Sequence, residues 1–146
     1  MLSMKAKYAL RALCVLADPE HGLMPARVLA TQALVPEKFL EAILVELRNA
    51  GLVQSKRGLL GGHSLARPAS EIGVGDIIRC IDGPIAPLRC ASVTAYAPCE
   101  DCVDPHNCSI RDLMADVRVA MCEVLDRRSL AELAERASSG RESLLV

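Results

Sequence analysis

Four cysteines in the second half of the chain have the side-chain type and the spacing for metal chemistry. They are Cys90, Cys99, Cys102 and Cys108, in the pattern C-x8-C-x2-C-x5-C. Thiolates bind soft and borderline metals, and four of them complete the first shell of Zn²⁺ or of an iron–sulfur cluster. The C-x2-C pair lets two thiolates converge on one metal centre. We interpret the segment as a metal site; a redox dithiol or a set of inert thiols is the alternative.

The cysteine pattern leaves zinc and iron–sulfur both open. Structural zinc knuckles usually pair two C-x2-C units, and only one occurs here, so a cluster suits the spread spacing at least as well. His106 is a candidate substitute ligand, although a lone histidine in such a loop is more often only solvated. Four thiolates serve both [2Fe–2S] and [4Fe–4S] clusters, so the nuclearity stays open.

The segment that carries these cysteines is predicted to be a loop. Residues 83–108 contain four prolines, at positions 84, 87, 98 and 105, and cannot form one continuous helix. A loop of about 25 residues in a compact domain needs a reason, and metal binding supplies one. The other cysteines, Cys14, Cys80 and Cys122, lie within apolar helical patterns, and we interpret them as packing residues.

Composition and charge limit the classes of function that the chain can have. The chain has 146 residues and seven cysteines, an odd number that argues against a disulfide framework. It has no apolar run of about 18 residues and no secretory signal, so we expect a cytoplasmic protein without a membrane partner. Residues 1–70 carry nine Lys/Arg and five Asp/Glu, a net +4, whereas residues 71–146 carry a net −5. A basic half in a nearly neutral chain indicates that this half meets a polyanion.

Residues 1–82 show the element order of a winged helix-turn-helix domain. The apolar spacing predicts helices over 3–17 and 25–33, and a third from Pro36 to Gly51. Extended segments then flank a glycine-bearing tip, which predicts a β-hairpin wing. The predicted fold class is mainly α with a small β-hairpin wing. A small α+β domain whose hairpin is only structural is the alternative.

These elements suit DNA binding. The third helix is polar enough on one face to enter a major groove, and the wing presents Lys56 and Arg57 to phosphates or to a minor groove. An enzyme is not indicated, because paired carboxylates, a phosphate loop and a Ser/His/Asp arrangement are all missing. His21, His63 and His106 are dispersed, and no small-molecule substrate is evident.

Residues 109–126 are predicted to form a long dimerisation helix, for which Ser109 is a candidate cap. Their apolar positions recur at steps of three and four residues and leave a stripe that needs a partner. Self-association is the economical choice, since two-fold dimers are the commonest oligomers. Packing back on the chain's own domain is the alternative. Residues 127–146 are predicted to start as a weak helix and end as a flexible tail. The stripe residues are Ile110, Leu113, Val117, Ala120, Met121 and Val124.

The sequence resembles the Rrf2-type transcriptional regulators from about residue 1 to 126. The resemblance lies in the first helix, the third helix, the wing and the helix that follows the wing. The matching residues are Lys5-x-Lys7-Tyr8-Ala9-Leu10-Arg11-Ala12-Leu13, Phe39-Leu40-Glu41, Leu47-Arg48-x-Ala50-Gly51-Leu52-Val53, Arg57-Gly58-x-x-Gly61-Gly62-x-x-Leu65-Ala66-Arg67-Pro68, Ile72-x-Val74-x-Asp76-Ile77-Ile78-Arg79 and Asp82-Gly83-Pro84.

The resemblance implies a homodimeric regulator of a palindromic operator, switched by an iron–sulfur cluster that senses redox state, iron or nitric oxide. A cluster-free regulator switched by zinc or by thiol chemistry is the alternative. On the matching positions, Lys38 and Glu41 are base-side candidates. Lys56 is a phosphate candidate, and Arg57, with Gly58 beside it, is the minor-groove candidate.

Three departures from the family pattern affect the site. The wing has Leu59 and Leu60 where the family commonly has Pro-Gly. Some relatives take a cluster ligand from the first helix, but the corresponding positions here are Lys7 and Arg11, which are poor ligands. We therefore expect all ligands to come from the loop, with Cys99, which is extra to the family pattern, completing a set of four.

Overall fold

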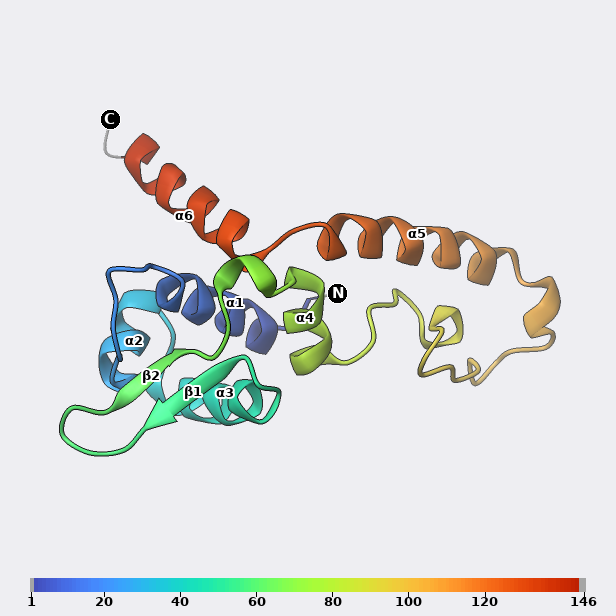
Figure 1. Cartoon of the computed structure of the whole chain (residues 1–146). Coiled ribbons are helices and arrows are strands. Elements are labelled where there is room, and N and C mark those ends of the chain that lie inside the picture. Colours follow the sequence, from blue (N-terminus) through green and yellow to red (C-terminus); the bar gives the residue numbers. More distant parts are fainter. Residues whose placement is uncertain (1, 145–146) are drawn as a thin grey trace.

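The computed structural model describes residues 2–144, which form a helical body, a two-stranded hairpin and a long helix extending from the body (Figure 1). This mainly α architecture with one hairpin is the predicted one. The elements in chain order are α1 (Met4–Leu16), α2 (Ala26–Ala33), α3 (Glu37–Asn49), β1 (Val53–Lys56), β2 (Gly62–Leu65), η1 (Ala69–Glu71), α4 (Val74–Asp82), η2 (Arg89–Ala91), η3 (Pro105–Asn107), α5 (Ser109–Asp126) and α6 (Leu130–Leu144).

Local residue chemistry sets the limits of the first three helices. Ser3 caps α1, because its side chain accepts a hydrogen bond from the Ala6 amide at 3.0 Å. Leu34 ends α2 in the left-handed region, with φ at 56°. Pro36 precedes the first turn of α3, and Gly51 follows its end with φ at 74°. The tight turn between α2 and α3 sets the geometry of the helix-turn-helix pair.

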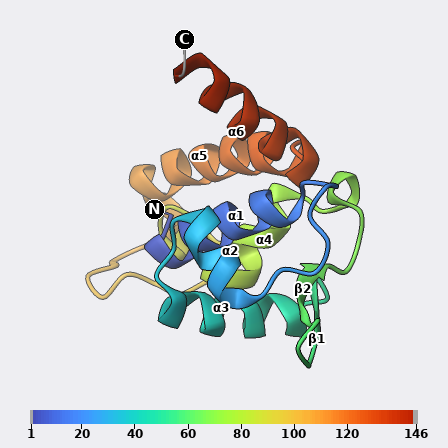
Figure 2. The same ribbon diagram turned by 90° about the vertical axis from the view of Figure 1, so that its left-hand side faces the viewer.

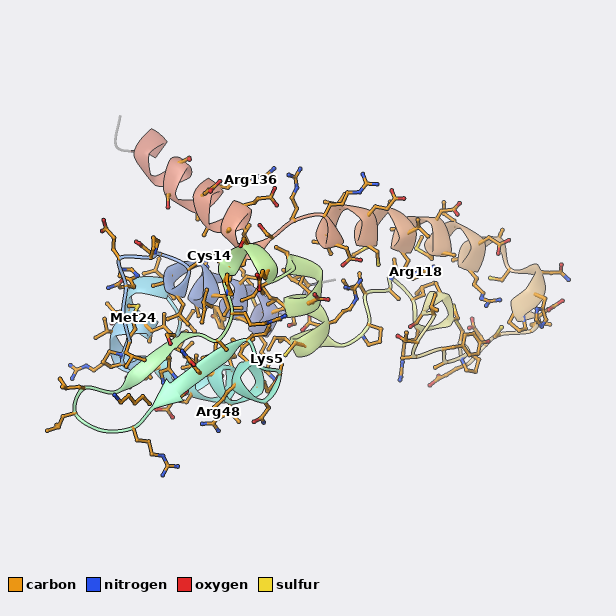
Figure 3. All side chains as sticks on the ribbon, viewed as in Figure 1. Lys5, Cys14, Met24, Arg48, Arg118 and Arg136 are labelled. Atoms are coloured by element: carbon orange, nitrogen blue, oxygen red, sulfur yellow. The ribbon has the colours of Figure 1, made fainter. Side chains whose placement is uncertain are left out.

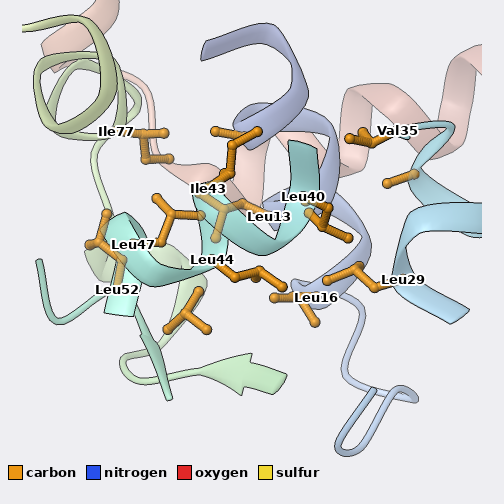
Figure 4. Packing of buried hydrophobic residues seen from close by; sticks show 14 of the residues in the cluster. Leu13, Leu16, Leu29, Val35, Leu40, Ile43, Leu44, Leu47, Leu52 and Ile77 are labelled. Carbon is orange, nitrogen blue, oxygen red and sulfur yellow. The ribbon is translucent and has the colours of Figure 1, made fainter. Parts of the chain in front are cut away.

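The core is built from aliphatic side chains on the inner faces of α1, α2 and α3 (Figure 4). Leu13, Leu29, Leu40 and Leu47 are completely buried, and Ile77 of α4 joins the same cluster. Among the described residues, no polar or charged residue is buried as a whole. The hydrophobic effect therefore holds the body together, and exposed polar faces are left for binding.

The wing is an antiparallel pair that is attached to the body at its base. Val53 pairs with Leu65 at one end of the hairpin, and Lys56 pairs with Gly62 at the other. Met24 forms a bridge with His63, through hydrogen bonds of 2.9 and 2.7 Å between their backbones. Strand β2 is therefore held on both sides close to the point where the tip begins.

The long helix α5 extends away from the body, and the cysteine loop runs alongside it (Figure 1). Arg79 of α4 donates to both carboxylate oxygens of Asp126, at 2.7 and 2.9 Å, and so ties the C-terminal end of α5 to the body. Among the described residues, no helix is both long and apolar enough to cross a membrane.

The C-terminal segment is helical over most of the range predicted to start as a weak helix and end as a tail. The helix α6 runs to Leu144, and it begins at a completely buried residue, Leu130. The Leu130 amide donates to the Ile72 carbonyl at 2.8 Å, and the Val74 amide donates to the Arg128 carbonyl at 2.9 Å. Figure 2 shows α6 crossing the body on the side opposite α3. The chain therefore returns to its own core after α5; residues 145–146 lie outside the described part.

Candidate functional site

The outer face of α3 carries the predicted base-side residues. Lys38 and Glu41 are both exposed on this helix. The Lys38 ammonium lies 5.0 Å from the centroid of the Phe39 ring, which stacks on Tyr8 of α1 at 6.4 Å. This stack stabilises the first turn of α3 against α1. The chain has only three aromatic residues, and two of them form this contact.

The wing places Lys56, Arg57 and Gly58 at its exposed end. Figure 2 shows the wing tip projecting past α3 on the same side of the body. Arg48, exposed near the end of α3, also points to this side (Figure 3). The structure therefore brings the predicted helix and wing residues to one face, which suits a DNA groove and its phosphates.

His63 of β2 lies at the edge of this face without adding to its charge. Burial, and secondarily the positive charge of Arg48, lower the pKa of the imidazole. Its Nδ1 lies 2.8 Å from the hydroxyl of Ser55, its cross-strand partner. The imidazole is therefore neutral at pH 7, and the positive charge of this face comes from Lys and Arg.

The four predicted cysteine ligands line one pocket of about 420 Å³, between the loop and the first turn of α5. Cys90 is buried and Cys99 is exposed, while Cys102 and Cys108 are half-buried. Asp101, Asp104 and Asn107 also line this pocket, whereas His106 does not. The fold thus brings together thiols that are up to 18 positions apart in the chain.

Two of these thiols already have the separation that metal ligation requires. The Cys99 thiol points to the Cys90 sulfur at 3.8 Å. Two thiolates on one tetrahedral metal, each bound at about 2.3 Å, also lie about 3.8 Å apart. Within residues 2–144, no group of three or more His, Cys, Asp or Glu side chains is arranged to hold a metal ion. The donor chemistry therefore fits a metal or cluster, provided that Cys102 and Cys108 move towards the pair.

Without a metal the Cys99 thiol stays protonated. The hydrogen bond to Cys90, followed by the charge of Cys90, raises the pKa of the Cys99 thiol above its ordinary value. A bound metal reverses this preference because it stabilises the thiolate.

The pocket is tied to α5 by two residues at the start of that helix. Cys108, rather than the predicted Ser109, is the N-cap, and its sulfur accepts from the Arg111 amide at 3.5 Å. The Arg111 guanidinium donates to the carbonyls of Cys90 and Pro105, at 2.9 and 2.8 Å, and lies 5.5 Å from the Tyr96 ring centroid. Sequence reasoning missed Arg111, because its contacts join positions up to 21 residues apart.

The predicted dimerisation stripe on α5 is uncovered in the single chain. None of the helix's residues is buried. Ile110 and Val124, near its two ends, are 62% and 63% exposed, and Leu113 is 58% exposed. Val117 and Met121 are less exposed, and Ala120 is exposed as well. A continuous apolar face of this length on a monomer is typical of an interaction site.

The sequence and the fold of the chain match a known group of proteins. The model of the Rrf2 family, described as iron-dependent transcriptional regulators, matches residues 2–136. The chain belongs to the Rrf2 family of transcriptional regulators. It is 42% identical over 137 residues to an rrf2-like HTH-type transcriptional regulator of Rhodobacter capsulatus. The aligned part covers 91% of each chain.

Two solved structures show the same winged-helix fold. CymR, described as the global cysteine regulator of B. subtilis, superposes with a TM-score of 0.75 at 35% identity and covers 93% of this chain and 97% of its own. IscR of T. potens superposes with a TM-score of 0.72 at 30% identity and covers 94% and 88%. This Rrf2-family chain is therefore a DNA-binding transcriptional regulator with a winged helix, as the sequence resemblance implies.

Proposed function

We propose that this Rrf2-family chain is a homodimeric regulator whose affinity for a palindromic operator is controlled at the cysteine pocket. One observation carries the proposal: the pocket and the dimerisation stripe meet on the first turn of α5. Ile110 belongs to both, Cys108 caps the helix, and Arg111 clamps the loop to it. A change in the pocket therefore acts directly on the start of the helix that positions the second copy.

The dimer sets the distance between two DNA-reading faces. In each copy α3 enters the major groove with Lys38 and Glu41 towards the bases, while Lys56 contacts phosphate and Arg57, next to Gly58, reaches the minor groove. Two such faces bind half-sites whose spacing is geometric, so a shift of α5 changes operator affinity.

The proposed group in the pocket is an iron–sulfur cluster held by Cys90, Cys99, Cys102 and Cys108. The family description as iron-dependent supports iron, and the thiol pair at 3.8 Å supports ligation by thiolates. When bound, such a cluster supplies redox and ligand-exchange chemistry that responds to oxidants, nitric oxide or iron supply. Cys108 is the N-cap of α5, so a ligand bound to its sulfur lies directly at the start of that helix.

A zinc or thiol switch is the second candidate. The same Cys90–Cys99 pair favours it, since closing from 3.8 Å to a disulfide needs only a small motion and an oxidant such as a peroxide. The likeness to CymR, described as a global cysteine regulator, also supports a thiol-based signal.

Metal analysis separates these candidates. Iron, acid-labile sulfide and zinc are measured per chain on protein purified without oxygen, together with the visible spectrum. We expect iron and sulfide with charge-transfer absorbance, and a change in duplex affinity when the cluster is removed. Cys99→Ser should lower the iron content sharply, whereas Cys80→Ser, a cysteine outside the pocket, should leave it unchanged. Zinc alone, or no metal, would exclude the cluster.

The dimer has its own test on α5. Val117 lies in the stripe, and Val119 lies on the opposite side of the helix with similar exposure, 37% against 45%. Val117→Asp should convert the dimer to a monomer in sedimentation velocity, because it places a charge in the apolar seam. Val119→Asp is the matched control and should remain dimeric. If the Val117→Asp variant remained a dimer, the interface would have to lie elsewhere than on the apolar stripe of α5.

A further inference from the structure

The tip of the wing carries two leucines that the proposed contacts do not use. Leu59 is 105% exposed and Leu60 is 89% exposed, which places them among the most exposed large apolar residues described. They occupy the two corner positions of a four-residue turn, in which the Gly61 amide donates to the Gly58 carbonyl at 3.0 Å. Corner positions of turns usually hold polar residues, proline or glycine. Two leucines there have no role in the folding of the described chain.

The turn that presents the leucines is tightly shaped. Gly58 has φ at 109°, which side chains rarely adopt. A Cβ on Gly61 would lie 2.0 Å from the Lys56 carbonyl oxygen, so only glycine fits there. Two residues further on, His63 of β2 forms a backbone bridge with Met24. The leucines therefore stand on a defined support, and inserting them costs little ordering entropy.

The basic residues around the leucines indicate that their partner is a polyanion. Between Glu46 and Glu71 the chain has four basic residues and no acidic one; the basic residues are Arg48, Lys56, Arg57 and Arg67. The tip projects past α3 on the side to which Arg48 points (Figures 2 and 3). A narrow turn with two leucines has far less apolar area than the amphipathic helices that hold proteins on membranes. Duplex DNA, with charged edges and stacked apolar bases, fits this arrangement better than a lipid surface does.

We propose that Leu59 and Leu60 form an apolar wedge that enters the minor groove, partly unstacks one base step and bends the duplex. Apolar wedges of this kind act between base pairs in minor-groove proteins, and they bend DNA towards the major groove. The inserted step should be a flexible pyrimidine–purine step, because such steps cost least to unstack. This inference rests on the proposed DNA-binding face. It adds two residues that select DNA sequences by how easily the duplex bends, rather than by hydrogen bonds to base edges.

The test measures the bend and the salt dependence of binding separately. The probes are 30-bp duplexes selected by the wild-type protein from a pool with a random core, labelled at both ends for energy transfer. Wild-type protein should bend them by an angle within the 20–90° range of wedge proteins. The double variant Leu59→Ala/Leu60→Ala should bind about three- to tenfold more weakly and leave the duplex nearly straight, since lost apolar burial is partly offset by restored stacking.

Arg57→Ala is the matched control on the same tip. It should lower the slope of log affinity against log salt by about one, because it removes one positive charge from the DNA-binding face. The leucine variant should leave this slope unchanged, because it removes no charge. Leu59→Met/Leu60→Met should retain the bend. Both leucines are exposed, so thermal unfolding should be unaffected in every variant.

Replacing the selected pyrimidine–purine step by AA should weaken duplex binding by the wild-type protein. The affinity of the double alanine variant should not change. Wild-type binding without any bend, or a bend that persists in the double alanine variant, would overturn the wedge while leaving the DNA-binding function intact. The wedge would also be overturned if the double alanine variant lost the wild-type protein's binding to anionic vesicles but bent DNA as the wild type does. That result would assign the leucines to a lipid surface. No salt-dependent duplex binding by the wild-type protein would refute the proposed function itself.

Discussion

Replacing Arg111 by alanine should free the cysteine loop from α5 without unfolding the body. The guanidinium donates to the carbonyls of Cys90 and Pro105, at 2.9 and 2.8 Å, and lies against the Tyr96 ring. A hydrogen bond from a charged donor contributes about 1.5 kcal/mol at the lower end of its range, which suits a half-buried side chain. The ring contact adds about 0.5 kcal/mol. The closed loop should therefore lose about 3.5 kcal/mol relative to its open state.

Native-state hydrogen exchange measures this loss directly. About 1.4 kcal/mol corresponds to a factor of ten, so the opening constant of the loop should rise about 300-fold. Two loop amides report on it: the Ala91 amide donates to the Leu88 carbonyl at 3.0 Å, and the Ala97 amide donates to the Arg89 carbonyl at 3.3 Å. Their exchange should accelerate by up to the same factor, whereas that of the buried helices should not change.

Two variants keep the experiment specific. Arg111→Lys retains the charge but replaces a rigid fork by a single ammonium, so its exchange should be intermediate. Arg127→Ala removes a positive charge at the far end of α5 and should leave the loop unchanged. Unaltered exchange at Ala91 and Ala97 in Arg111→Ala would refute the clamp. Faster exchange throughout the helical body would also refute it, because the effect would then be global.

Three further predictions concern how the body supports the site. Leu130→Ala should destabilise the fold by about 2–5 kcal/mol in urea denaturation, because it removes a completely buried side chain and leaves a cavity. Gly62→Ala should weaken duplex binding and lower the melting temperature, since its Cβ would lie 2.6 Å from the Met24 backbone. The Arg79 hydrogen bonds hold the pKa of Asp126 below its ordinary value, so their stabilisation is present at neutral pH and lost as Asp126 protonates below about pH 4. Asp126→Asn should therefore cost less than about 1 kcal/mol at pH 7 in this exposed pair, and its stability should converge with that of the wild type in acid.

The sequence was most informative where the cause of a structure is local. The Ser3 cap, the proline before α3 and the glycine after it each act within a few residues, so these helix limits could be read from the residue order. The loop over 83–108 was also predictable, because its prolines exclude a continuous helix.

Contacts between distant parts of the chain could not be read in this way. The docking of the C-terminal helix on the body could not be predicted, because Leu130 enters a core formed by residues more than fifty positions earlier, such as Ile72. The cap of α5 is Cys108 rather than Ser109, since the loop delivers the cysteine sulfur to the Arg111 amide. Neither result follows from the helix propensity of the local residues, because each depends on the position of a distant segment in the folded chain.

For this protein the sequence by itself determined the types of chemistry, through four thiols, a basic wing and an apolar stripe of helical period. Those are properties of side chains and of the helix repeat, and they hold before the chain folds. Only the tertiary structure decided that the thiols share one pocket on the first turn of α5, with Arg111 as its clamp. It also decided that the wing and α3 share one face. Such proximity arises from burying a common aliphatic core, which brings together residues that are far apart in the chain.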